Sequence, residues 1–253
     1  MTAAPGAILL DKDGVLVDFH RTWKPAIKRA AARVARLASV DAARQEELAA
    51  HLLAIVGHDA TTDTFLPGSI WAAGTQEELF DAWAAELPGV PRQAIAAEVT
   101  AELSAAEPLP PVPLEELIHW LDAARAAGWK LAVVTNDLTA SARATAERHG
   151  YARLLDAIIG SDLVERPKPH PDLVHHAARV LGLPPERMIV VGDNVHDGEM
   201  ARAAGCAAFI GVTSGTSGHA DLAPLAHAVE TDVTAALRRI LHMVEVERLA
   251  SAR

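Results

Sequence analysis

The sequence is poor in cysteine, in basic residues and in long apolar runs, and each scarcity excludes a class of protein. Cys206 is the only cysteine, which excludes an internal disulfide and a cysteine-based zinc site and favours a reducing compartment. Lys and Arg number 23 against 33 Asp and Glu, and the net charge of -10 argues against nucleic acid or an anionic membrane as a partner. No stretch reaches the roughly 18 apolar residues of a membrane helix, and the N-terminus lacks the basic residues of a signal peptide. We therefore expect a soluble cytoplasmic protein.

Short apolar runs alternate with amphipathic helical patterns over most of the 253 residues. We predict strands at Ala7–Leu10, Leu131–Val134, Ala157–Ile159, Met188–Val191 and Ala207–Ile210. The predicted helices between them are Leu114–Ala127, Ala140–His149, Pro171–Leu181 and Asp197–Ala204. Because this alternation is typical of βαβ units, the predicted fold class is α/β, a Rossmann-like parallel sheet with helices on both faces.

Residues 18–113 interrupt the alternation and predict an inserted all-α cap domain. Helical patterns occur at Pro25–Leu37, Asp41–Val56, Thr75–Glu86 and Pro91–Ala105, separated by a long polar loop at Gly57–Ile70. Asp41 and Thr75 are predicted N-caps, and Thr75 forms a capping-box pattern with Glu78. The proline-rich segment Pro108–Pro113 is typical of a stiff linker. We predict a core of residues 1–17 and 114–253, ending in a helix at Val229–Leu249, with the cap inserted after the first strand.

Polar side chains directly follow several predicted strands. Asp11 and Asp13 follow the first, Thr135 and Asn136 the second, Lys168 lies in the loop after the third, and Asp193, Asn194 and Asp197 follow the fourth. Each has an ordinary structural interpretation as a turn residue, a helix cap or a solvated lysine. Ligands of open α/β sheets bind at the carboxyl ends of the strands, however, and polar residues of complementary type at four such ends together favour a functional site.

The combination of carboxylates, a hydroxyl and a lysine suits phosphoryl transfer. Carboxylates packed together repel one another and a phosphate, and a hard divalent cation such as Mg²⁺ relieves this repulsion because it prefers oxygen ligands. Lys168 and Thr135 can bind phosphoryl oxygens, and a carboxylate can attack phosphorus as a covalent nucleophile. We therefore expect Mg²⁺ as the cofactor.

Four segments, 11–18 (DKDGVLVD), 133–136 (VVTN), 166–169 (RPKP) and 191–197 (VGDNVHD), resemble the ordered motifs of the haloacid dehalogenase-like hydrolase superfamily. The resemblance is greatest to phosphoglycolate-phosphatase-like members with a helical cap, and it covers essentially the whole chain. It implies that Asp11 is the nucleophile and that Asp13 is the general acid and base, with a backbone carbonyl that helps to hold Mg²⁺. It further implies catalytic roles for Thr135 and Lys168 on the phosphoryl group, substrate binding by Asn136, metal binding by Asp11, Asp13 and Asp193, and supporting roles for Asp197 and Asn194.

The same residues leave some alternatives open. Asp13 favours a phosphatase or a phosphomutase over a dehalogenase, which lacks this aspartate, and a non-catalytic phosphate-binding protein is a further alternative. Lys24 and Lys28 are interpreted as solvated residues, and the loop at residues 211–218 as a flexible segment near the rim of the site. Arg21 of the cap either binds a second anionic group of the substrate or is a surface arginine. The expected partner is a small phosphorylated metabolite, whose identity the sequence leaves open, as it does the choice between monomer and homodimer.

Overall fold

The computed structural model describes residues 6–251, and side chains as far as residue 243. The chain divides into two compact units, one made of residues 1–17 and 110–253 and the other of Asp18–Leu109. Each unit has apolar core clusters of its own. Among the described residues, no helix has the length and apolar character needed to cross a membrane.

The α/β unit is built on a six-stranded parallel sheet with the strand order β5-β4-β1-β6-β7-β8. The strands are β1 (Ala7–Leu10), β4 (Lys130–Val134), β5 (Ala157–Ile159), β6 (Met188–Gly192), β7 (Ala208–Val212) and β8 (Ala228–Glu230). In the central register Ala7 lies between Lys130 and Met188, so that β1, β4 and β6 end at the same level. All six strands point in one direction, and their carboxyl ends form one edge of the sheet.

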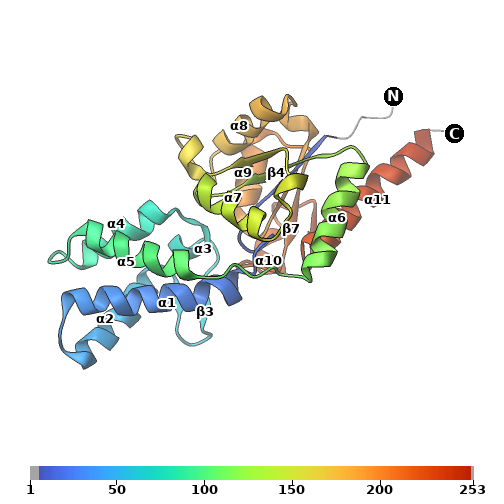
Figure 1. Cartoon of the computed structure of the whole chain (residues 1–253). Helices are drawn as coiled ribbons and strands as arrows, with labels where there is room; N and C mark the ends of the chain where they lie inside the picture. The colour runs from blue at the N-terminus through green and yellow to red at the C-terminus, as the bar shows by residue number, and fades with distance from the viewer. Residues whose placement is uncertain (1–5, 252–253) are drawn as a thin grey trace. The chain divides into compact units, whose positions relative to one another are not determined.

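Helices cover both faces of this sheet. The α/β unit contains α6 (Leu114–Ala126), α7 (Thr139–Arg148), α8 (Asp172–Leu181), α9 (Val195–Ala204), α10 (His219–Leu222) and α11 (Val233–Ser251), with short 3₁₀ turns η1 (Ala152–Leu154), η2 (Ser161–Leu163) and η3 (Pro185–Arg187). Ile8 and Leu10 pack with α6, α7 and α11, whereas Ala7 and Leu9 pack with α8, α9 and α10. Figure 1 shows α6 and α11 side by side, as their shared apolar cluster requires. The alternation of strand side chains between two apolar layers confirms the predicted α/β fold.

The second unit is predominantly helical. Its helices are α1 (Phe19–Ala38), α2 (Ala42–Ile55), α3 (Ile70–Ala73), α4 (Gln76–Glu86) and α5 (Arg92–Ala105). Helix α1 packs on α2 and α5, and a separate apolar core surrounds the fully buried Trp83, whose Nε1 donates to the Leu52 carbonyl at 2.9 Å. Asp41 and Thr75 cap α2 and α4 as predicted, and the Thr75–Glu78 capping box is present.

Three local expectations were wrong. Residues 228–230 form strand β8 rather than the start of the last helix, because three residues of an edge strand leave too short an alternation to recognise. The loop Gly57–Ile70 contains a hairpin of β2 (His58–Asp59) and β3 (Thr64–Phe65), held by backbone pairing that its polar composition conceals. Helix α1 begins at Phe19 rather than Pro25, because Asp18 accepts a hydrogen bond from the Arg21 amide and caps the helix.

Candidate active site

The sheet brings the predicted polar residues to one edge. Asp11 follows β1, Thr135 follows β4 and Asp193 follows β6, and these three strands are neighbours. The Asp11 amide continues the pairing of β1 by donating to the Val191 carbonyl at 2.9 Å. The carboxyl ends of adjacent parallel strands therefore place residues that are distant in sequence within reach of one another.

Asp11 and Lys168 form a buried ion pair that also includes Asp197. The Lys168 Nζ lies 2.5 Å from Asp11 Oδ1 and 2.6 Å from Asp197 Oδ1, and all three residues are buried. Burial, reinforced by the negative charge of Asp197, raises the pKa of Asp11 to about 6, although the Lys168 charge opposes this shift. Burial also disfavours the charged form of Lys168, but the two carboxylates outweigh it and raise its pKa. The cation at this edge is thus held charged next to the predicted nucleophile.

Asn136 fixes the backbone of Lys168. Its side-chain carbonyl accepts a hydrogen bond from the Lys168 amide at 2.9 Å, and its amide group donates to the Lys168 carbonyl at 3.2 Å. The loop after β4 therefore holds the loop that carries the lysine. The substrate-binding role expected of Asn136 stays a prediction, and the observed contact is one that positions Lys168.

Asp193 is held by the loop that follows β7. The amide and hydroxyl of Thr216 both donate to Asp193 Oδ2, at 2.8 and 3.1 Å, and the Asn194 amide group donates to the Thr216 hydroxyl at 2.9 Å. The backbone of Gly215 approaches so closely that a Cβ there would lie 2.0 Å from Asp193 Oδ2. The expected position of residues 211–218 near the site is confirmed, because this loop packs directly on a site carboxylate, whereas the expected flexibility stays a prediction.

Asn194 and Asp197 form the N-terminal cap of α9. Asn194 accepts from the His196 amide at 3.2 Å, and Asp197 Oδ2 accepts from the Asn194 amide at 3.1 Å. One oxygen of Asp197 thus serves the helix while the other contacts Lys168. Gly192 is required beside them, because a Cβ at this position would lie 2.3 Å from the Asp197 carboxyl carbon. The supporting roles expected of Asn194 and Asp197 stay predictions, and the observed contacts are those of a helix cap and of an ion pair with Lys168.

Asp13 belongs to a second charged group with Lys12 and Asp137. The fully buried Lys12 Nζ lies 2.8 Å from Asp13 Oδ2 and 2.8 Å from Asp137 Oδ2. Burial, together with the charges of Asp137 and Asp11, raises the pKa of Asp13 against the opposing effect of Lys12. Burial would raise the pKa of Asp137 as well, but the Lys12 charge and hydrogen bonds from Lys12 and Ser141 hold it below its ordinary value. The two acidic groups consequently differ in their preference for a proton.

The remaining two predicted residues lie in different units. Thr135 is buried, and it follows β4, the strand next to the one that Asp11 follows. Its hydroxyl accepts a hydrogen bond from the Asp137 amide at 3.1 Å. Arg21 belongs to the helical unit, where its guanidinium is 65% exposed and pairs with Asp18 at 3.8 Å. The roles expected of Thr135 on phosphate and of Arg21 on substrate stay predictions.

The donor set at the sheet edge suits a divalent cation. Asp11, Asp193 and Asp197 each offer a carboxylate oxygen, and these oxygens lie within 4.8 Å of one another. Three carboxylates against the one ammonium of Lys168 leave two negative charges without compensation, which equals the charge of one such cation. Burial and the neighbouring carboxylates Asp11 and Asp197 raise the pKa of Asp193 well above its ordinary value, as expected for a carboxylate that requires a further positive charge. Carboxylate oxygens are ligands that Mg²⁺ prefers.

Five residues of this site were not assigned a role in it from the sequence. They are Lys12, Asp137, Ser214, Gly215 and Thr216, of which Ser214 donates to the Gly14 carbonyl at 2.6 Å. Lys12 and Asp137 were visible as opposite charges next to predicted site residues on adjacent strand ends. Residues 214–216 follow β7 of the same sheet, and this position after a strand end could have indicated that they belong to the site. The glycine, serine and threonine content of the segment suggested a flexible loop instead.

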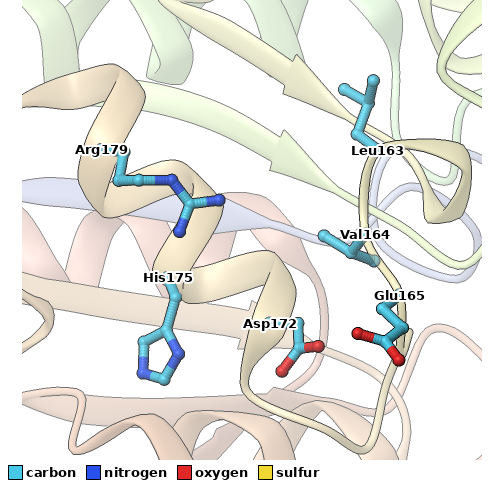
Figure 2. Close-up of a pocket in the computed structure, with 6 residues that line it drawn as sticks. All are labelled: Leu163, Val164, Glu165, Asp172, His175 and Arg179. Carbon is cyan, nitrogen blue, oxygen red and sulfur yellow. The ribbon is translucent and has the colours of Figure 1, made fainter.

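A separate pocket of about 270 Å³ lies elsewhere on the α/β unit (Figure 2). It is lined by Leu163, Val164, Glu165, Asp172, His175 and Arg179, and Asp172 is paired with Arg166 at 2.9 Å. Figure 2 shows Asp172, His175 and Arg179 on α8, and Leu163, Val164 and Glu165 on the facing segment, which comprises the end of η2 and the residues after it. None of these lining residues belongs to the predicted site, so the pocket is distinct from the carboxylate cluster at the sheet edge.

Comparisons with known proteins identify a family and several relatives of this chain. A family model described as haloacid dehalogenase-like hydrolase matches residues 5–205. The chain is 44% identical over 88 residues to a probable phosphatase, IndB, of Dickeya dadantii, and 39% identical over 95 residues to a phosphoglycolate phosphatase of Salmonella paratyphi A. These matches cover 35% and 38% of this chain and only 38% and 37% of the relatives' own lengths.

A solved structure supports the fold over nearly the whole chain. The crystal structure of a predicted phosphoglycolate phosphatase from Haemophilus somnus superposes with a TM-score of 0.67 at 19% sequence identity. The superposition covers 95% of this chain and all of the other. At this identity the likeness concerns the fold, whereas the family model spans most of the sequence, including the motifs that carry the site residues. The chain belongs to the haloacid dehalogenase-like hydrolase family.

Proposed function

We propose that the protein is a Mg²⁺-dependent phosphatase that hydrolyses a small organic phosphate monoester through an aspartyl-phosphate. The observation that carries this proposal is the buried pairing of Asp11 Oδ1 with Lys168 Nζ at 2.5 Å, beside the carboxylates of Asp193 and Asp197. A site that only bound phosphate would gain nothing from a carboxylate placed against the anion. A carboxylate that attacks phosphorus requires both the nearby ammonium and a further cation.

In the first step Asp11 attacks the phosphorus atom of the substrate. The bond between phosphorus and the ester oxygen breaks, and its electron pair stays on the leaving oxygen. Lys168, held by Asp11, Asp197 and the Asn136 clamp, offers its ammonium to the phosphoryl oxygens and offsets their charge. Thr135, at the end of the neighbouring strand, is proposed as a hydrogen-bond donor to the same group.

Asp13 is proposed as the acid of the first step and the base of the second. Its carboxyl proton passes to the leaving oxygen, which departs as an alcohol. The resulting carboxylate then takes a proton from water, whose oxygen attacks the phosphorus and releases inorganic phosphate and free Asp11. The raised pKa of Asp13 supports this assignment, because a larger fraction of the carboxyl group then carries the proton that the first step has to donate.

Asp11, Asp193 and the Asp13 backbone carbonyl are proposed to hold Mg²⁺. The ion, when bound, neutralises charge on the phosphoryl group and on the nucleophile. Asp193 is already oriented by Thr216, and Asp197 is committed to Lys168 and to its helix cap. Asp197 and Asn194 are therefore proposed to support the site rather than to bind the ion directly.

The substrate is proposed to be a small phosphorylated metabolite, with phosphoglycolate or a sugar phosphate as examples. The support is the similarity to phosphoglycolate phosphatase, which covers only part of that relative's length. The unit Asp18–Leu109 is proposed as the cap that selects the organic part of the substrate, with Arg21 as a candidate for binding a second anionic group. The charge of -10 supports neither a nucleic acid nor an anionic membrane as partner.

Inorganic phosphate release from a panel of phosphate monoesters in the presence of Mg²⁺ tests this proposal. We expect Asp11→Asn to lower kcat/KM by about 10⁴-fold or more, as losses of covalent nucleophiles do. The matched control is Asp122→Asn, the same substitution at an exposed position of α6, which is expected to leave kcat/KM unchanged. A phosphomutase would interconvert phosphate esters and release little inorganic phosphate. Unchanged hydrolysis by Asp11→Asn, or none by the wild type across the panel, would refute the proposal.

A further inference from the structure

Lys12 is an unusual residue to find buried in this position. It lies between the two aspartates of the loop after β1, it is 1% exposed, and its Nζ contacts Asp13 Oδ2 and Asp137 Oδ2 at 2.8 Å each. The two carboxylates come from different loops, one after β1 and one after β4. The Lys12 ammonium thus links Asp13, the residue proposed as both acid and base, to the loop at the end of β4.

Packing alone does not account for a lysine here. Burying an ammonium is costly unless it is paired, and an apolar side chain of similar length would fill the same space without that cost. The lysine is therefore tolerated only while both carboxylates hold it. The same contacts, in turn, restrict the rotation of the Asp13 carboxyl group, because one of its oxygens is engaged by a side chain that cannot move into solvent.

Asp137 is itself anchored to the start of α7. It accepts a hydrogen bond from the Leu138 amide at 2.7 Å and another from the Ser141 hydroxyl at 2.6 Å. These bonds fix Asp137 relative to the first turn of a helix, and Asp137 in turn fixes Lys12. The chain of contacts runs from α7 through Asp137 and Lys12 to Asp13 and provides a rigid support for that carboxyl group.

We propose that Lys12 and Asp137 are positioning residues that orient the Asp13 carboxyl group toward the leaving oxygen of the substrate. This inference rests on the proposed phosphatase function. Neither residue touches the substrate in this scheme, and both act through Asp13. The proton transfer from Asp13 depends on the placement of the carboxyl group, and misplacement by about 1 Å can cost about 10²-fold in rate.

Leaving groups distinguish this role from a general structural one. A nitrophenolate departs without receiving a proton, whereas phenolate and alkoxide leaving groups depend on the acid. The kcat/KM value reports the steps up to and including release of the alcohol, so it isolates the step in which Asp13 donates. Loss of the Lys12 support should therefore penalise poor leaving groups selectively.

The experiment compares kcat/KM for p-nitrophenyl phosphate, phenyl phosphate and glycerol 3-phosphate in the wild type, Lys12→Met and Asp137→Asn. We expect both variants to lose about 100-fold on phenyl phosphate and glycerol 3-phosphate but less than about 10-fold on p-nitrophenyl phosphate, within the range of general acid catalysis. The matched control is Lys130→Met at the opposite end of β4, whose Nζ donates to the Leu181 carbonyl at 2.6 Å. This control should leave the ratio between the substrates unchanged.

Each outcome has a defined meaning. Equal losses on all three substrates, or no loss on the two poor leaving groups, would overturn the positioning role while leaving the phosphatase function intact. If Lys12→Met does not fold, Asp137→Asn, which keeps the shape of the side chain, decides alone. If the wild type hydrolyses no ester of the wider panel described above, or if Asp11→Asn has no effect, the proposed function fails and this inference fails with it.

Discussion

Gly215→Ala is the substitution that tests the architecture of the proposed metal site most directly. A Cβ at this position would lie 2.0 Å from Asp193 Oδ2, 2.3 Å from its Cγ and 2.6 Å from its Cβ. Ordinary contact begins at 3.4 Å, so the loop or the carboxylate has to move by more than about 1 Å. Asp193 cannot move away easily, because Thr216, which follows Gly215 in the chain, donates two hydrogen bonds to its Oδ2.

The displacement predicts three separate effects, on stability, on kcat/KM and on the Mg²⁺ requirement. Overpacking of this kind costs about 1–3 kcal/mol in the free energy of unfolding. A shift of about 1 Å in a group that orients the reaction costs about 10²-fold in kcat/KM. Because Asp193 is the displaced group, the Mg²⁺ concentration for half-maximal activity should rise by about 10-fold or more.

The assay is phosphate release as a function of Mg²⁺ concentration, with thermal unfolding measured on the same samples. The control is Gly89→Ala in the helical unit, where an added Cβ meets nothing within 4 Å and the backbone φ is not positive. This control should match the wild type in both measurements. A Gly215→Ala protein with wild-type activity and wild-type Mg²⁺ dependence would refute the reasoning that this loop holds a metal-binding carboxylate.

Three further results are expected. Asn136→Ala removes both hydrogen bonds to the Lys168 backbone and should lower kcat/KM by about 10-fold, within the cost of misplacing a group that orients the reaction. A variant with lower thermal stability but an unchanged kcat/KM in steady-state kinetics would contradict this expectation. Mg²⁺ at 100 times its dissociation constant should stabilise the protein by about 2.7 kcal/mol relative to EDTA, an effect that Asp193→Asn should abolish in thermal unfolding. Hydrogen bonds from its two arginine partners hold the pKa of Glu102 below its ordinary value of 4.5, so its stabilisation is complete above that pH and is lost as the pH falls through the lower folded value. Glu102→Gln should therefore lower the free energy of unfolding by about 1 kcal/mol near neutral pH, a small value because both arginines are half exposed. In urea unfolding, the difference in this free energy between variant and wild type should shrink below pH 4.5. A difference that stays constant with pH would contradict the assignment.

Much of the fold follows from local patterns in the sequence. The central strands are apolar runs that are followed directly by polar or charged residues, and they were predicted to within one residue at β1, β4 and β6. The capped helices α2 and α4 were recognisable because Asp41 and Thr75 cap them with their own side chains. Strand β8 was missed because it is short and lies at the edge of the sheet, where a pairing with β7 rather than its own composition defines it.

The site was predictable where it depends on chain order and unpredictable where it depends on contacts across the sheet edge. That Asp11, Thr135 and Asp193 follow neighbouring strand ends is a consequence of the parallel sheet, whereas Lys168 reaches this edge from a longer loop after β5. The pairing of Lys12 with Asp137 requires the register of β1 against β4, and local periodicity does not contain that register. The use of Asn136 as a clamp on another loop likewise depends on a contact between residues 32 positions apart.

The closure of the helical unit on itself has a consequence for how such a chain can change. The Asp18 amide donates to the Leu109 carbonyl at 2.7 Å, and the Leu109 amide donates to the Thr22 hydroxyl at 3.0 Å, so the segment leaves and returns at one point. The six strands of the sheet all belong to the α/β unit, and none comes from the chain between Val17 and Pro110. Since the entropy of closing a loop grows only slowly with its length, this junction can accept a shorter, longer or unrelated module at small cost. If the helical unit selects the substrate as proposed, the reaction chemistry and the choice of substrate can be inherited separately.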